Sequence, residues 1–91
     1  MSFKKLRGVD LPEEKQGLIR YTCLTYRDQN EKMQKKINRL CEEHGGFYGA
    51  ALWEVMCTKE SIVSISLRHH LSESSIYRMR KDFYENWNKK K

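Results

Sequence analysis

Apolar residues recur at three- and four-residue intervals along the C-terminal third of the chain. Ile62, Ile65 and His69 share one face of a helix. A second periodic run follows after Leu71 and contains Ile76, Met79 or Arg80, Phe83 and Trp87. Because only a few residues separate the two runs, the pattern predicts a helix, a tight turn and a second helix over residues 58–87.

Hydroxyl residues stand where these two helices should begin. Thr58 and Ser72 are the predicted N-caps, because a hydroxyl oxygen can accept a hydrogen bond from an otherwise unpaired amide of the first turn. Glu73 follows Ser72 and places negative charge at the positive end of the helix dipole.

The opposite face of the second predicted helix is polar and basic. It carries Ser74, Ser75, Tyr77, Arg78 and Lys81. Small hydroxyl residues allow close approach to a groove, and arginine or lysine one or two turns further on can reach phosphates or guanine edges. This is the composition of a DNA-recognition helix. An ordinary helical pair with a solvated polar face is the alternative interpretation.

The N-terminal half also has helical periodicity. Asp10, Pro12 and Glu13 resemble the start of a helix with a capping box. Asp28 with Glu31 indicates either a second helix or a bend near Arg27 and Asp28. The predicted inward residues of the first helix are Leu18, Ile19, Thr22, Cys23 and Tyr26. Those of the second are Met33, Ile37, Leu40, Cys41 and His44.

Gly45 and Gly46 predict the end of that second helix, because glycine adopts the left-handed C-terminal conformation without strain. A further apolar stripe follows, with Trp53 beside it as a residue that packs under a neighbour or marks an interface. The stripe consists of Phe47, Tyr48, Ala51, Leu52, Val55 and Met56.

The predicted fold is therefore all-α: a small helical domain of about five helices with a C-terminal helix-turn-helix. Residues 10–91 form the single domain, in which 10–45 is a helical pair and 46–91 is a trihelical unit containing the helix-turn-helix. Residues 1–9 carry Lys4, Lys5 and Arg7 without periodicity and are predicted to be a flexible basic arm.

Charge favours an acidic partner. The net charge is +6, and residues 59–91 hold 8 basic and 4 acidic side chains, so the excess is concentrated at the predicted helix-turn-helix. A basic patch of this kind fits nucleic acid, although it also fits other acidic partners.

Other functional classes receive little support from the sequence. No apolar run approaches the length of a membrane span, and no signal peptide is recognisable, so we expect a cytoplasmic protein with no membrane partner. Cys23, Cys41 and Cys57 lack framework spacing and are expected to be reduced and buried. Cys41 and His44 have a C-x-x-H spacing, but no second pair completes a zinc site. No catalytic constellation is apparent, so neither an enzyme nor a cofactor is predicted.

The segment LSESSIYRMR, within residues 61–80, resembles the helix-turn-helix of sigma-factor region four and its phage-borne relatives. With CEEHGGFYGAALWEVM before it, the layout is similar to small late-transcription regulators of phages and prophages in Gram-positive bacteria. The resemblance covers about half of the chain and implies a DNA-binding regulator. It places a small residue, Ser66, where the two helices touch. It implies core roles for Ile65, Leu71, Ile76 and Met79, and exposed recognition roles for Ser72, Glu73, Ser74, Tyr77, Arg78 and Lys81.

Two histidines depart from the family pattern. His69 stands where an aliphatic residue is usual, and we expect it to be partly buried and hydrogen-bonded. His70 stands where the turn often has glycine, so it would have to adopt an unusual backbone conformation.

The leading hypothesis is a regulator that reads double-stranded DNA by inserting a helix of residues 72–91 into the major groove. Arg68, Arg80 and the terminal lysines would anchor phosphates. The predicted DNA-binding residues are Arg68, Ser72, Glu73, Ser74, Ser75, Tyr77, Arg78, Arg80, Lys81, Lys89, Lys90 and Lys91. Two alternatives stay open: the DNA-recognition subunit of a phage packaging terminase, and an interaction module that binds RNA polymerase. A homodimer is compatible with the first hypothesis.

Overall fold

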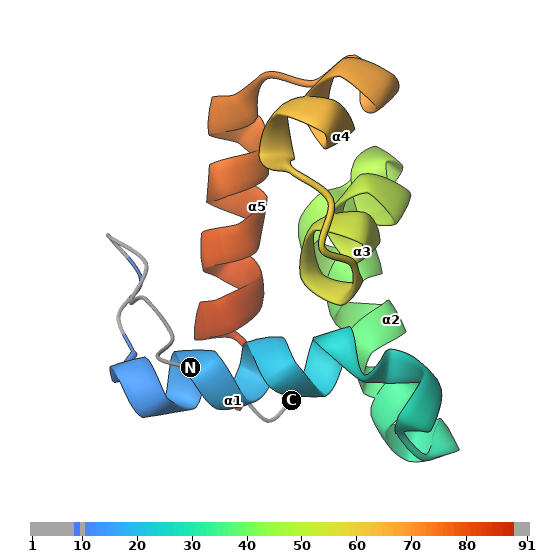
Figure 1. Cartoon of the computed structure of the whole chain (residues 1–91), viewed down its shortest axis with the longest axis vertical. Helices are drawn as coiled ribbons and strands as arrows, with labels where there is room; N and C mark the ends of the chain where they lie inside the picture. Colours follow the sequence, from blue (N-terminus) through green and yellow to red (C-terminus); the bar gives the residue numbers. More distant parts are fainter. Residues whose placement is uncertain (1–8, 10, 89–91) are drawn as a thin grey trace.

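The computed structural model describes residues 9 and 11–88, and this part of the chain is helical without β-strands (Figure 1). The all-α prediction is confirmed. Two short 3-10 turns, η1 (Tyr26–Asp28) and η2 (Gly46–Tyr48), lie between helices. The α-helices are α1 (Glu13–Leu24), α2 (Glu31–Gly45), α3 (Gly49–Cys57), α4 (Ile62–His69) and α5 (Glu73–Glu85).

Helix α3 lies at the centre and packs against α1, α2, α4 and α5. Figure 1 shows α1 across one end of the molecule and α4 at the other, with α5 running between them. Ala51, Leu52 and Met56 of α3 are completely buried, which is what a short helix of almost uninterrupted apolar sequence requires. The core predicted for this helix is thus confirmed, apart from Phe47.

Two predicted core residues are exposed instead. Leu18 is 65% exposed and Phe47 is 94% exposed. The inward face of α1 is centred on Ile19 and Cys23, so Gln16, three residues before Ile19, is buried while Leu18 turns away. Gln16 is accommodated because its Nε2 donates to the Leu11 carbonyl at 2.9 Å. Phe47 lies in η2, before α3 begins, and is therefore out of phase with the buried face of that helix.

Helix α2 follows the predicted stripe, with Ile37, Leu40 and Cys41 buried. Its end is also as predicted, since Gly46 has a φ of 54° and caps the helix. The predicted bend near Arg27 and Asp28 is present as η1, and a new helix follows it, but the residue that caps this helix differs from the prediction. Asn30 is the N-cap, with its side-chain oxygen accepting from the Met33 amide at 2.8 Å, whereas Asp28 lies in η1.

The N-terminal boundary also needs correction. Helix α1 begins at Glu13 after Pro12, which provides no side-chain cap, and Asp10 lies outside the described residues. Val9, assigned from the sequence to the flexible arm, is only 6% exposed and belongs to the core cluster. Lys4, Lys5 and Arg7 of that arm lie outside the described residues.

Arg20 joins α1 to the end of α3. Its guanidinium donates to the carbonyl oxygens of Val55, of Met56 at 2.8 Å and of Thr58 at 3.1 Å. These are carbonyls that the end of a helix leaves without internal partners, and a cation there also complements the helix dipole. Arg20 therefore closes the C-terminus of the central helix.

The aromatic and sulfur groups complete the core. Trp53 packs edge-on against Tyr26 with ring centroids 5.3 Å apart, so it packs under a neighbouring residue. All three cysteines are free; Cys23 and Cys41 are buried, whereas Cys57 is only half-buried. Among the described residues no helix is long and apolar enough to cross a membrane, and no three His, Cys, Asp or Glu side chains are grouped to hold a metal ion.

Candidate nucleic-acid interface

Helices α4 and α5 are joined by three residues, His70 to Ser72, with a well-defined conformation. His70 is left-handed, with φ 56° and ψ 44°, as its place in the turn predicted. The amides of His70 and Leu71 both reach the Ser66 carbonyl, the second at 3.0 Å. Ser72 then caps α5 by accepting from the Ser75 amide at 3.2 Å, which confirms that N-cap prediction.

The predicted start of α4 at Thr58 is wrong. Ser61 is the N-cap and accepts from the Ser64 amide at 3.1 Å. Thr58 instead ends α3, and its hydroxyl donates to the Glu54 carbonyl at 2.6 Å. A hydroxyl residue can stabilise either end of a helix. Because α3 and α4 are separated by only a few residues, the sequence did not show whether Thr58 ends the first or begins the second.

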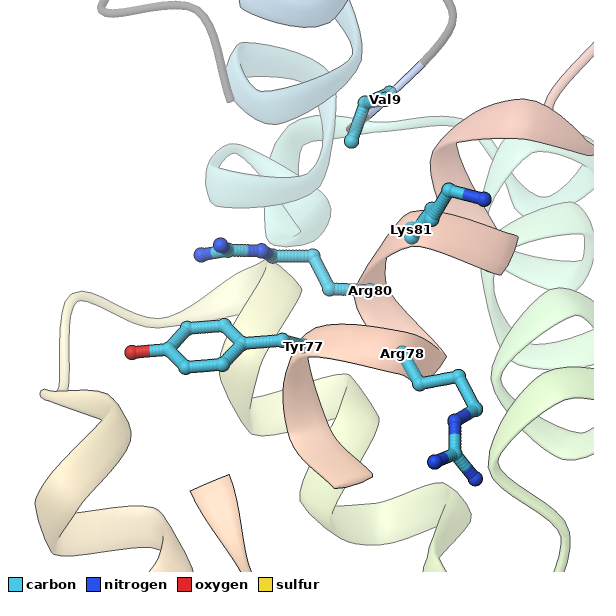
Figure 2. Close-up of a pocket in the computed structure, with 5 residues that line it drawn as sticks. All are labelled: Val9, Tyr77, Arg78, Arg80 and Lys81. Carbon is cyan, nitrogen blue, oxygen red and sulfur yellow. The ribbon is translucent and has the colours of Figure 1, made fainter. Parts of the chain in front are cut away.

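The exposed side of α5 gathers four of the predicted DNA-binding residues around one hollow. Tyr77, Arg78, Arg80 and Lys81 line a pocket of about 420 Å³ whose remaining wall is Val9 (Figure 2). In Figure 2 the side chains of Tyr77 and Arg80 extend to one side of the helix, and that of Arg78 extends to the other. Tyr77, Arg78, Arg80 and Lys81 thus form a basic ridge along α5 that borders an open hollow and does not enclose a cavity.

The cations on this ridge differ in how strongly they are engaged. Arg78 is exposed and makes no ion pair with the residues that the structure describes. Arg80 is half-buried, lies 5.1 Å from the Tyr77 ring centroid, and has its pKa lowered by burial and by the nearby charge of Arg20. Lys81 has Glu85 as a partner, with Nζ and Oε1 3.7 Å apart.

Serines at the start of α5 mostly serve the helix itself. The hydroxyl oxygens of Ser72 and Ser75 are 2.8 Å apart, and those of Ser72 and Ser74 are 3.2 Å apart. Glu73 and Ser74 are exposed, so the first turn presents one carboxylate and a hydroxyl to solvent. The structure thus places these predicted residues at one end of the ridge formed by Tyr77, Arg78, Arg80 and Lys81.

Arg68 lies apart from the ridge and is held by acidic residues. Its guanidinium bonds Glu54 at 2.6 Å and also both carboxylate oxygens of Glu60. Glu54 also bonds His69, with Oε2 and Nε2 2.8 Å apart, so His69 is half-buried and hydrogen-bonded as predicted. The positive charge of Arg68 is therefore offset by two carboxylates.

The last helix is shorter than predicted. It ends at Glu85, and the Asn86 side-chain amide donates to the Asp82 carbonyl at 2.8 Å. Trp87 lies beyond the helix yet is only 9% exposed, with its ring centroid 5.8 Å from that of Phe83. Lys36 also contacts this ring, with its Nζ 4.2 Å from the Trp87 ring centroid. Lys89, Lys90 and Lys91 lie outside the described residues.

Comparison with known proteins gives no assignment. The chain matches no family model, no curated protein and no solved structure. What the chain does must therefore be inferred from its own geometry and charge.

Sequence reasoning missed the role of Arg20. The carbonyls that it binds are about 35 positions away along the chain, and no local pattern connects an arginine in one helix to the end of another. Its place between Gly17 and Cys23 indicated only a helical position.

Proposed function

We propose that the chain is a DNA-binding transcriptional regulator in which α4 and α5 act as a helix-turn-helix and α5 reads the major groove. The observation that carries the proposal is the basic ridge of Tyr77, Arg78, Arg80 and Lys81 on α5. A helix capped by Ser72, with exposed cations one to two turns from its start, has the shape and charge that a major groove admits. The proposal includes a cytoplasmic location and a non-enzymatic role.

Each side chain has a distinct part in this proposal. Arg78, exposed and without an ion-pair partner among the described residues, is assigned to base edges, where a guanidinium pairs with guanine O6 and N7. Arg80 and Lys81 are assigned to phosphates. Tyr77, 45% exposed, can contact a thymine methyl or a phosphate. The resemblance to phage and prophage late-transcription regulators agrees with these assignments and forms part of the proposal.

The test is a salt titration of affinity for a duplex selected from random DNA and for a scrambled duplex. Arg78→Ala should weaken binding to the selected duplex by about 1–3 kcal/mol and relax its sequence preference. Arg27→Ala is the matched control, because Arg27 is an exposed arginine in η1, away from α5. Deleting Lys89 to Lys91 should weaken both duplexes alike and flatten the salt dependence.

Equal losses on both duplexes for Arg78→Ala would remove that residue from base reading. Failure of the parent protein to bind either duplex would overturn the proposal as a whole. Symmetric half-sites in the selected DNA would indicate that the protein binds as a dimer.

One observation favours a protein partner as a second candidate function. Val63 and Leu67 lie one turn apart on α4 and are 51% and 72% exposed. An aliphatic pair on the outside of a small domain suits a protein contact such as RNA polymerase. Replacing both with serine should abolish capture of purified polymerase and leave duplex affinity unchanged. Loss of neither property would exclude this second function.

A further inference from the structure

A second pocket, which shares Arg80 with the first, lies where α1, α5 and the segment between α3 and α4 meet. Its volume is about 230 Å³, several times the roughly 30 Å³ that one water occupies in the liquid. Two arginines from different helices line it, Arg20 of α1 and Arg80 of α5, together with Tyr84. The other lining residues are Val55, Glu60, Ser61 and Ile62.

Tyr84 is the unusual group in this pocket. The side chain is only 2% exposed, and its hydroxyl makes no hydrogen bond with the residues that the structure describes. The hydroxyl is not sealed inside the core, since the fully enclosed side-chain polar atom without a partner in the described part of the chain is Nε2 of His44. Tyr84 lines the pocket instead. Burial raises the pKa of Tyr84 to about 12, so the phenol remains a proton donor at neutral pH. A phenol that lines a pocket and has no partner among the described residues can donate to an acceptor that enters the pocket.

The surrounding charge indicates that the acceptor is an anion. Among the described residues, Arg80 forms no ion pair and Arg20 bonds to carbonyl oxygens of α3 and of Thr58 after it, so no carboxylate neutralises either guanidinium directly. The one carboxylate in the wall, Glu60, has both oxygens bonded to Arg68. Ser61 and Ile62 place the N-terminus of α4 at the pocket, which adds a partial positive charge.

We propose that this pocket binds a phosphate-class oxyanion, with the Tyr84 hydroxyl donating to one oxygen and Arg80 and Arg20 balancing the charge. The chemistry is the same for a free phosphate group and for a phosphate of a nucleic-acid backbone. The site does not depend on the proposed reading of DNA by α5, because none of its groups besides Arg80 belongs to the ridge of Tyr77, Arg78, Arg80 and Lys81.

The first experiment uses inorganic phosphate without DNA, with chloride keeping the ionic strength constant. Phosphate should raise the thermal midpoint of the parent saturably. Tyr84→Phe, which removes only the hydroxyl, should weaken phosphate affinity about tenfold, as expected for a hydrogen bond to a charged group. Arg80→Gln should abolish the effect. Arg78→Gln is the matched control, since it removes the same charge from α5 outside this pocket, and it should keep the parent's affinity within about twofold.

A measurement on the parent protein tests the same site without any variant that could fail to fold. In its NMR spectrum, phosphate should shift the amides of Ile62 and Val63 and the side-chain Nε–H signals of Arg20 and Arg80. An absence of saturable binding, shifts spread evenly over all basic side chains, or equal losses for Arg78→Gln and Arg80→Gln would overturn the site.

A second arm separates the two sources of the oxyanion. If a backbone phosphate occupies the pocket, inorganic phosphate at constant ionic strength will weaken duplex binding by the parent more than by Tyr84→Phe. If the two titrations are alike while phosphate binding persists, the natural ligand is a free phosphate compound. Failure of the protein to bind any duplex would refute the proposed function and leave the first experiment unaffected.

Discussion

At the scale of single residues, His70 is where the chain accepts backbone strain. It is the non-glycine residue with positive φ in the described part of the chain, and its side chain is exposed. The left-handed conformation costs an ordinary residue about 1–2 kcal/mol, whereas glycine adopts it freely but loses more entropy on folding. His70→Gly should therefore raise the free energy of unfolding by about 0.5–1 kcal/mol.

Chemical denaturation measures this effect, and His70→Ala is its control, because alanine keeps the Cβ that causes the strain. A gain for glycine and none for alanine is the expected result. Equal changes in both variants would show that the imidazole, and not the backbone, determines the stability of the turn.

Buried weak acids should make the fold sensitive to alkali. Burial raises the pKa of the Cys41 thiol to about 12, and the pKa values of Cys23 and Tyr84 are also raised. These groups bind their protons more tightly in the folded state than in the unfolded state. They therefore stabilise the fold fully at pH values below their unfolded-state pKa, and this stabilisation is lost as the pH rises towards their folded-state pKa. Between these two pKa values, each group can lower the free energy of unfolding by up to about 1.4 kcal/mol per pH unit.

The measurement is denaturant unfolding between pH 8 and 11 under reducing conditions. Cys41→Ala will lower the stability at every pH through lost packing, but its stability should fall less steeply with pH than that of the parent. Parallel curves for the two proteins would contradict the prediction.

The caps show how far the sequence determines local structure. Ser72 was identifiable because a turn, a hydroxyl and an acidic first turn coincide there. Thr58 and Asp28 were chosen wrongly because Ser61 and Asn30 lie two or three residues further on and satisfy the same rule. Which of two adjacent candidates caps a helix depends on how much chain the preceding turn needs, and tertiary packing decides that.

At the scale of elements, α5 is held by its aromatic face. Phe83 is completely buried, packs beside Tyr84 and lies near Trp87. Phe83→Ala should lower the free energy of unfolding by about 3–5 kcal/mol, enough to abolish folding in a domain of this size. Phe47→Ala makes the same change at a side chain that is 94% exposed and should alter stability by less than about 0.5 kcal/mol.

Thermal or denaturant unfolding of both variants tests this prediction. An unfolding transition of Phe83→Ala that matches the parent's would show that the buried face of α5 is assigned incorrectly. A large loss for Phe47→Ala would reveal a contact that the isolated chain does not show.

Helical periodicity predicted the faces of α2 and α5 well and that of α1 less well. The first two have one continuous apolar stripe, whereas α1 offers Leu18 and Tyr21 on one side and Ile19 and Cys23 on another. The sequence could not show which side meets α3, since this depends on Arg20 reaching the end of that helix. The burial of the Gln16 side-chain amide also follows from which side of α1 faces α3.

At the scale of the whole molecule, the sequence predicted the sign of the charge but not its distribution. The sequence predicted both Arg68 and Arg80 as phosphate anchors. In the structure Arg68 is bound to Glu54 of α3 and to Glu60, whereas Arg80 lines both pockets. Ion pairs between residues 8 and 14 positions apart have no signature in helical periodicity. Within the described residues, Arg68 is thus held in ion pairs, whereas Arg80 has no ion-pair partner and packs against the Tyr77 ring.

This division gives a direct test of how the molecule uses its charge. Arg80→Gln and Arg68→Gln change the net charge equally, so a long-range electrostatic effect would be the same for both. If Arg80 contacts a phosphate, its loss should reduce the magnitude of the slope of log affinity against log salt by about 1. Arg68→Gln should leave the slope unchanged within error, because that arginine has few donors left to offer a phosphate. Affinities for a scrambled duplex at four or more salt concentrations measure both slopes. Equal reductions in the two variants would show that the ion pairs of Arg68 open when DNA binds.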